Sequence, residues 1–168
     1  MEKNPVDKHQ IVTSNSWASL RRHTDARIGL GRSGISQPTA PQLAFQQAHA
    51  RARDAVHIPL DVRQLQSDLT EAGLQSLLLH SQAEDRATYL QRPDKGRRLD
   101  ADSAALLKQL SEQQPASDAT IVIADGLSST AVQRHAARVA AEIDRRLAAA
   151  GLSRTQVCIV QQGRVAVG

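Results

Sequence analysis

The chain has 168 residues, with 21 Lys or Arg against 17 Asp or Glu and a net charge of +4. This excess is too small for a nucleic-acid coat protein, and the single cysteine, Cys158, excludes an internal disulfide and a cysteine-based metal site. No apolar run approaches the ~20 residues of a membrane span, and Met1 to Gln10 lack the apolar core of a secretory signal, so we expect a soluble cytoplasmic protein.

The first half of the chain predicts helices joined by glycine- and proline-rich connections. Residues 1–14 are polar and without a sustained period, which indicates a flexible arm. A short helix is predicted from Asn15 or Ser16 through Arg27, and a longer one over 40–56, where apolar residues recur at helical spacing. A third helix is predicted over 62–80, although Gly73 interrupts it.

A basic stretch, residues 86–99, places five Lys or Arg side chains around the sequence Pro93-Asp94-Lys95-Gly96. Proline fixes one torsion and glycine permits a positive φ, so these four residues predict a defined turn that holds Arg92, Arg97 and Arg98 near one another. The charge density indicates an anionic neighbour. A solvated surface loop is the alternative.

The second half predicts an α/β unit. A helix follows Asp100 and ends by Pro115, and residues 119–124 form a short β-branched run typical of a buried strand. A long amphipathic helix then ends at Gly151, and residues 156–160 resume the strand pattern. A strand, helix and strand in this order favour parallel pairing. Two strands leave the sheet unfinished, so either other segments supply strands or the polypeptide continues in a longer relative.

Chemistry is expected at the carboxyl ends of the predicted strands, where α/β sheets bind ligands. Residues 125–129 and 161–165 occupy that position, although a tight turn with a helix cap also explains Asp125-Gly126. No phosphate-binding glycine motif, metal-ligand spacing or nucleophile motif is present, and Cys158 in an apolar strand reads as a core residue. We therefore predict no catalytic residue and no metal site.

Four segments and one helix resemble the small subunit of ethanolamine ammonia-lyase. The segments are L-R-R-H-T-D-A-R-I-G-L-G-R-S-G (20–34), D-R-A-T-Y-L-Q-R-P-D-K-G-R-R-L (85–99), I-V-I-A-D-G-L-S-S (121–129) and Q-G-R-V (162–165), with F-Q-Q-A-H-A-R-A-R-D-A-V as the helix. The resemblance implies an adenosylcobalamin-dependent lyase that converts ethanolamine to acetaldehyde and ammonia. It also implies a large-subunit partner in a hetero-oligomer, with cobalamin between the chains and a bacterial microcompartment as an alternative location.

The chain is thus expected to consist of the arm (1–14), a helical region with the basic turn (15–115) and an α/β part (116–168), which the resemblance identifies as the beginning of a Rossmann-like cobalamin-binding domain. The expected fold is thus α/β, a helical N-terminal region followed by a partial Rossmann-like parallel sheet. Val165 matches a cobalamin contact of the family. We add its neighbours Gly163 and Arg164, and from strand-end geometry Asp125, Gly126 and Ser128. The charge of the basic stretch suggests contact with the large subunit.

Family members continue beyond the position of Gly168 with a glutamate-bearing loop and a later cysteine that also contact cobalamin, and Cys158 does not match that cysteine. We therefore expect a fragment or truncated product that alone binds cobalamin poorly and has no lyase activity. Two alternatives remain. A chain that copurifies with the large subunit but shows no cobalamin spectrum would be a non-catalytic interaction subunit, and strong, salt-sensitive gel retention would indicate a basic nucleic-acid-binding module.

Overall fold

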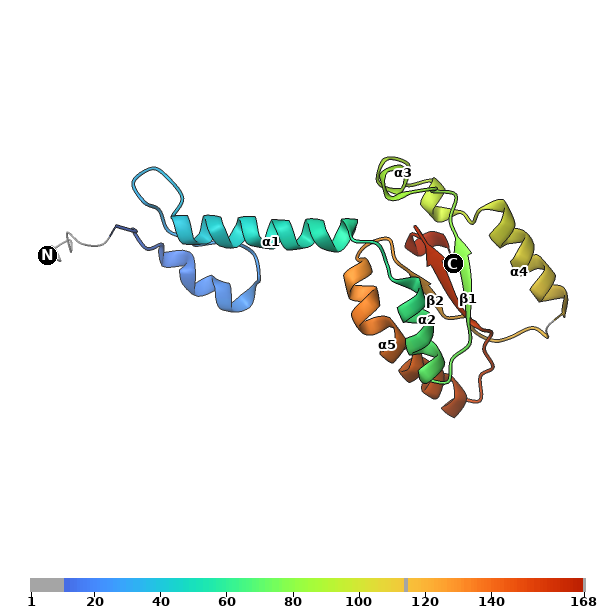
Figure 1. Cartoon of the computed structure of the whole chain (residues 1–168). Coiled ribbons are helices and arrows are strands. Elements are labelled where there is room, and N and C mark those ends of the chain that lie inside the picture. The colour runs from blue at the N-terminus through green and yellow to red at the C-terminus, as the bar shows by residue number, and fades with distance from the viewer. Residues whose placement is uncertain (1–10, 114, 168) are drawn as a thin grey trace, which may run out of the picture. The chain divides into compact units, whose positions relative to one another are not determined.

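The computed structural model describes residues 11–113 and 115–167, and the chain divides into two compact units, one ending at Ala52 and the other beginning at Arg53 (Figure 1). In the first unit, a 3₁₀ helix η1 (Ser16–His23) begins after Asn15, whose side chain accepts a 2.9 Å hydrogen bond from the Trp17 amide. The prediction that this helix reaches Arg27 is wrong. Thr24 is extended and its hydroxyl accepts from the Ala26 amide, a local bond that competes with helix formation.

Most of the predicted flexible arm, residues 1–10, lies outside the described residues. Its last part is not free, because the Thr13 amide donates to the Arg32 carbonyl at 2.7 Å and the Arg32 amide donates back at 3.0 Å. The predicted helix over 40–56 is confirmed as α1 (Thr39–His57), the element in which the two units join. None of its residues is buried, so its stability does not come from a packed apolar face.

The second unit is an α/β structure, as predicted, with a parallel sheet in the order β1-β3-β2. Each strand is short, and β3 pairs with β1 over its whole length and with β2 from Cys158 to Val160. Its elements are α2 (Val62–Glu71), β1 (Ser76–His80), α3 (Arg86–Gln91), the 3₁₀ helix η2 (Lys95–Arg97), α4 (Ala101–Gln113), β2 (Val122–Ala124), α5 (Ser129–Ala149), β3 (Val157–Gln161) and the 3₁₀ helix η3 (Val165–Val167).

Strand β1 corrects the prediction of one helix over residues 62–80. The helix α2 ends at Glu71, Gly73 turns the chain with φ +76°, and the leucine-rich run that follows is a strand. In register, Leu78 lies opposite Ile159 of β3. The periodicity of a short apolar run does not distinguish a helix from a strand, so here the pairing with β3 determines that the run is a strand. The strand missing from the predicted sheet therefore comes from the region predicted to be helical.

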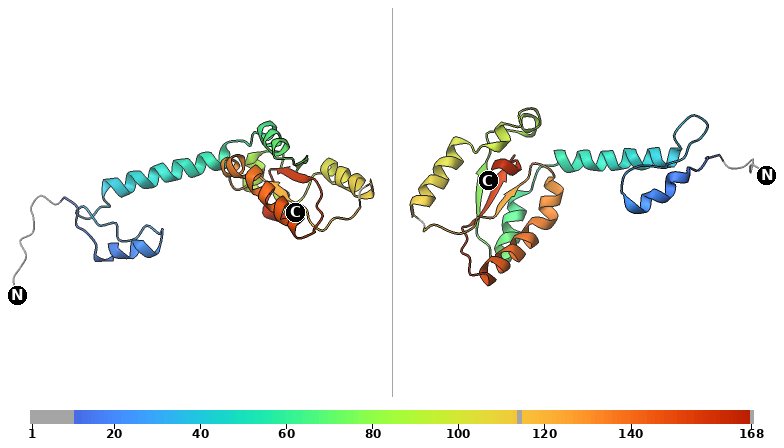
Figure 2. Two further views of the ribbon diagram at one scale, coloured as in Figure 1. Left: turned by 90° about the horizontal axis from the view of Figure 1, so that it is seen from below. Right: turned by 180° about the vertical axis from the view of Figure 1, so that it is seen from behind.

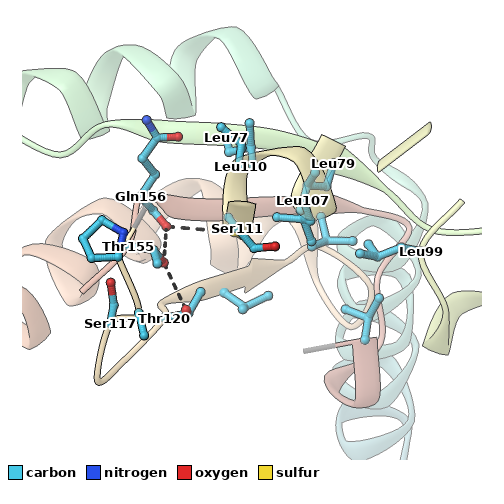
Figure 3. A pocket seen from close by; sticks show the side chains of 16 residues that line it. Leu77, Leu79, Leu99, Leu107, Leu110, Ser111, Ser117, Thr120, Thr155 and Gln156 are labelled. Atoms are coloured by element: carbon cyan, nitrogen blue, oxygen red, sulfur yellow. Dashed lines mark hydrogen bonds between the residues drawn. The ribbon is translucent and has the colours of Figure 1, made fainter. Parts of the chain in front are cut away.

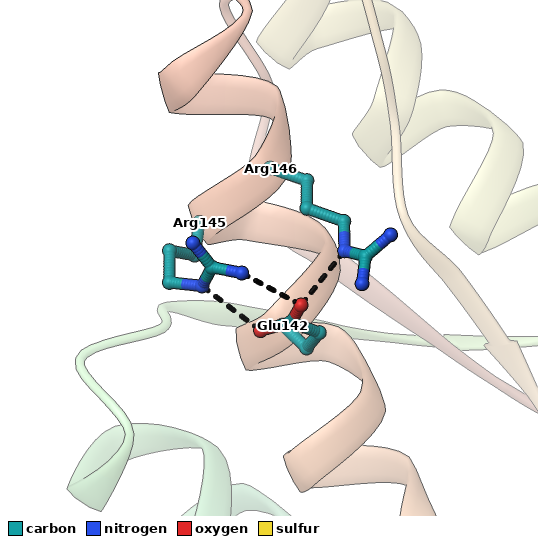
Figure 4. A network of polar contacts seen from close by, with 3 residues as sticks. All are labelled: Glu142, Arg145 and Arg146. Atoms are coloured by element: carbon teal, nitrogen blue, oxygen red, sulfur yellow. Dashed lines mark hydrogen bonds and ion pairs between the residues drawn. The ribbon is translucent and has the colours of Figure 1, made fainter.

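The sheet is covered unequally on its two faces (Figure 2). One face packs against α2 and α5, and the cluster there includes the fully buried Leu65, Leu69 and Ile159. The other face, with Leu79 and Val160, packs against α4 and η3. On the exposed side of α5, Glu142 bonds to both Arg145 and Arg146 (Figure 4).

Candidate functional site

The carboxyl ends of all three strands meet at one edge of the sheet because the strands are parallel. The Ser81 amide, just after β1, donates to the Gln161 carbonyl at 3.1 Å, and its hydroxyl donates to the Gln162 carbonyl at 2.8 Å. We call the residues that meet at this edge the strand-end cluster: Ser81, Arg86, Tyr89, Asp125, Gly126, Gln162, Gly163 and Arg164.

Two glycines of the strand-end cluster permit close contacts: Gly126 lets the loops after β2 and β3 touch, and Gly163 packs against the ends of β2 and β3. A Cβ atom at Gly126 would lie 2.2 Å from the Gly163 carbonyl oxygen and 2.3 Å from the Tyr89 hydroxyl, closer than any side chain permits. A Cβ atom at Gly163 would lie 3.0 Å from the Val160 carbonyl oxygen. Both glycines therefore serve contacts within the chain.

Tyr89 of α3 is buried at the centre of the cluster, with 2% of its surface exposed. The guanidinium carbons of Arg164 and Arg86 lie 4.4 and 4.8 Å from its ring centroid. Arg86 also donates to the Gly126 carbonyl at 3.2 Å, and Arg164 donates to the Tyr89 carbonyl at 3.1 Å. Cation–π contact and these hydrogen bonds join α3 to both strand-end loops.

Asp125 is the charged residue buried in the cluster, with 3% of its surface exposed and its Oδ1 atom without a hydrogen-bond partner. Burial raises the pKa of its carboxyl group because the charged form loses its hydration. The Arg86 guanidinium and the backbone amides of Gly163 and Gln162 act in the opposite direction.

The structure brings five of the six predicted site residues into the cluster or next to it, and leaves Val165 facing outward. Ser128 caps α5, because its hydroxyl accepts from the Ala131 amide at 3.1 Å. Val165 is 87% exposed and Leu127, beyond the end of β2, is 74% exposed. Apolar side chains that remain in solvent beside two neighbouring strand ends are available to a ligand or a partner.

The basic stretch reverses direction as predicted, but through the 3₁₀ helix η2, with hydrogen bonds from the Lys95 amide to the Arg92 carbonyl and from the Arg97 amide to the Asp94 carbonyl. The predicted use of Gly96 is wrong, because Gly96 has no positive φ and is instead closely packed against Tyr89 and Arg164. One anionic partner of the basic stretch lies within the stretch itself, namely Asp94. Arg92 pairs with Asp94 at 2.8 Å, and this pairing lowers the pKa of the Asp94 carboxyl group to about 2. Arg97 and Arg98 are exposed.

Sequence reasoning gave no site role to four residues of the strand-end cluster: Ser81, Arg86, Tyr89 and Gln162. One signal was available for Tyr89, which is one of only three aromatic residues in the chain and lies inside the basic stretch. Gln162 carries no comparable signal, although its φ of +52° is unusual for a residue other than glycine. Ser81 belongs to the edge only because β1 is a strand.

A separate apolar groove lies between α4 and the second face of the sheet (Figure 3). Its volume is about 720 Å³. Leu77 and Leu79 of β1 and Leu107 and Leu110 of α4 line it, and Cys158 of β3 forms part of its floor. The groove lies on a face of the sheet, whereas the strand-end cluster lies at its edge.

Within residues 11–113 and 115–167, no helix is long and apolar enough to cross a membrane. No group of three or more His, Cys, Asp or Glu side chains in these two ranges is arranged to hold a metal ion.

Comparison with known proteins gives one consistent result. Residues 14–168 match the family model described as Ethanolamine ammonia-lyase light chain (EutC). The chain is 54% identical over 162 residues to the ethanolamine ammonia-lyase small subunit of Ralstonia nicotianae and 52% identical over 163 residues to that of Pseudomonas fluorescens strain Pf-5. Each match covers 96% of this chain and 60% of the relative, so the chain spans about three fifths of these relatives.

Proposed function

Since the chain belongs to the ethanolamine ammonia-lyase light chain family, we propose that it acts as the small-subunit component of an ethanolamine ammonia-lyase. The reaction converts ethanolamine to acetaldehyde and ammonia, and the substrate is bound by a large-subunit partner. The observation that carries the proposal is the family match over residues 14–168, which includes the whole described sheet and its carboxyl edge.

The residues at this edge fit a large amphipathic cofactor such as adenosylcobalamin. Val165 and Leu127 offer apolar surface at the ends of adjacent strands, and the strand-end cluster beside them holds the Arg86 and Arg164 guanidinium groups over the Tyr89 ring. Such a combination suits a ring system that carries polar substituents. Adenosylcobalamin, when bound, supplies the radical chemistry of the reaction.

In this proposal the chain binds and shields, and no residue of it reacts. Val165 contacts the cofactor, and the neighbouring Arg164 anchors the loop that carries Val165 through its bonds to the Gly96 and Tyr89 carbonyls. Gly126 allows the two loops to approach one another, and Gly163 packs against the ends of β2 and β3. Asp125 is buried in the same cluster, and Ser128 fixes the start of α5. The two exposed arginines of the basic stretch, Arg97 and Arg98, remain available to the large subunit.

The test is reconstitution of the 168-residue chain with the large subunit of a relative and adenosylcobalamin. We expect the complex to retain the cobalamin absorbance on gel filtration and the variant Val165→Asp to lose it. Val139→Asp is the matched control, because Val139 is an exposed valine on α5, away from the strand ends.

The outcomes separate the candidate functions. Retained cobalamin with production of acetaldehyde supports the lyase proposal. Co-elution of the two proteins without cobalamin supports a non-catalytic interaction subunit instead. A complex that keeps cobalamin equally well with Val165→Asp contradicts the assignment of Val165.

A further inference from the structure

The loop that carries Val165 leaves β3 through a backbone conformation that needs support. Gln162 has φ +52°, in the left-handed region that residues with a side chain rarely adopt. Strained residues of this kind persist where their surroundings fix them. The Ser81 hydroxyl bond to the Gln162 carbonyl supplies part of that support from β1.

The rest of the loop is held by the segment that contains α3 and η2. The Arg164 amide donates to the Gly96 carbonyl at 2.7 Å, and the Arg164 side chain donates to the Tyr89 carbonyl at 3.1 Å. A Cβ atom at Gly96 would lie 3.2 Å from both the Arg164 Cγ and the Tyr89 ring. The α3–η2 segment therefore packs closely on the residue that precedes Val165.

Tyr89 is the side chain that connects this segment to both loops. Its ring lies beneath the Arg164 guanidinium on the β3 side, and its hydroxyl lies against Gly126 on the β2 side. Because the ring is almost completely buried, it cannot itself touch a large ligand. Its effect on any ligand must therefore pass through Arg164 and the loop.

We propose that Tyr89 is a positioning residue, which fixes the Gln162–Val165 loop through Arg164 and so presents Val165 to the cofactor. This inference rests on the proposed function. It assigns a role to the basic stretch: its Tyr89 and Gly96 hold the cofactor loop in place, while Arg92, Arg97 and Arg98 stay in solvent.

The first experiment measures hydrogen exchange of the 168-residue chain, without any ligand. In Tyr89→Leu we expect the Arg164 and Val167 amides to exchange at least about tenfold faster, while the amides of α5 and the centre of β3 keep their protection. Tyr89→Phe keeps the ring under both guanidinium groups and should restore slow exchange. Protection in α5 shows that each variant is folded. Unchanged exchange at Arg164 in Tyr89→Leu overturns the inference.

A second pair of variants removes a guanidinium group without touching the ring. Arg164→Met deletes the contact with Tyr89, and Arg145→Met deletes an exposed arginine that bonds to Glu142 on α5. The two changes alter net charge equally. We expect faster loop exchange only in Arg164→Met, and equal loop exchange in both variants would contradict the role of Arg164.

The closing experiment measures adenosylcobalamin affinity of the complex with a large subunit. We expect Tyr89→Leu to raise the Kd about tenfold, which corresponds to ~1.4 kcal/mol, and Tyr89→Phe to bind like the unaltered chain. Failure of the unaltered complex to bind refutes the proposed function. Tight binding by both the unaltered complex and Tyr89→Leu leaves the proposed function standing and refutes positioning by Tyr89.

Discussion

The contact between the strand-end loops predicts a large effect of adding one methyl group at Gly126. Its Cβ atom would lie 2.2 Å from the Gly163 carbonyl oxygen, a backbone atom that cannot rotate away. Gly126 does not have a positive φ, so alanine adds no left-handed strain and the cost is steric. Overpacking of a rigid site costs typically ~1–3 kcal/mol, and we expect Gly126→Ala to lie at the upper end.

Gly96→Ala provides the matched comparison. Its Cβ atom would lie 3.2 Å from the Arg164 side chain, the Gln162 carbonyl oxygen and the Tyr89 ring, so each of the three must move by only a few tenths of an ångström, whereas the 2.2 Å contact at Gly126 requires a far larger shift. We expect a cost of about 1 kcal/mol or less.

Thermal unfolding followed by far-UV circular dichroism measures both effects. A loss of ~3 kcal/mol lowers the Tm of a domain of this size by about 10 °C, so Gly126→Ala should melt far below Gly96→Ala. The near-UV signal of Tyr89, the only tyrosine of the chain, should change in Gly126→Ala. Equal melting temperatures for the two variants would show that the loops do not touch as described.

Three further predictions concern other parts of the second unit. Asp100→Ala removes the 2.8 Å hydrogen bond from the Ser103 amide to the Asp100 carboxylate at the start of α4. We expect it to lower the free energy of unfolding, measured by urea titration, by about 1 kcal/mol, and an unchanged urea midpoint would contradict this helix cap. Burial raises the pKa of the Cys158 thiol and shields it from reagents. A thiol reagent at neutral pH should therefore label the folded chain at least about 100-fold more slowly than the urea-unfolded chain. Equally fast labelling of both would show that the thiol is exposed to solvent. Hydrogen bonds from Arg145 and Arg146 hold the pKa of Glu142 at about 2, below its ordinary 4.5. The stabilisation by this ion pairing is present above pH 4.5 and is lost as the pH falls through about 2. Any excess of the Tm of the unaltered chain over that of Glu142→Gln should therefore disappear on acidification. A Tm difference that grows on acidification would contradict this ion pairing.

The periodic elements were predictable from the sequence. The helices α1, α4 and α5 follow from apolar spacing and from caps such as Asp100, and the strands β2 and β3 follow from short β-branched runs. Because these signals are local, they identify the elements without information about the rest of the chain. The α/β class and the parallel pairing followed from their order.

The candidate site was predictable in position but not in construction. The edge of the sheet and residues 125–128 and 163–165 could be named in advance because parallel strands place their carboxyl ends together. The residues that stabilise that edge could not be predicted. Tyr89 contacts Gly126, which lies 37 positions later in the sequence, and no local sequence pattern indicates such a contact.

Local sequence thus determined where most helices and strands form and which edge is available to a ligand. The tertiary structure alone decided that the Ser76–His80 run is a strand, because an unpaired leucine run satisfies its backbone equally well as a helix and only β3 supplies the alternative partners. It also decided that part of the basic stretch, through Tyr89 and Gly96, faces inward. Burial of a side chain depends on which distant backbone approaches it, and that is settled by the packing of the whole unit.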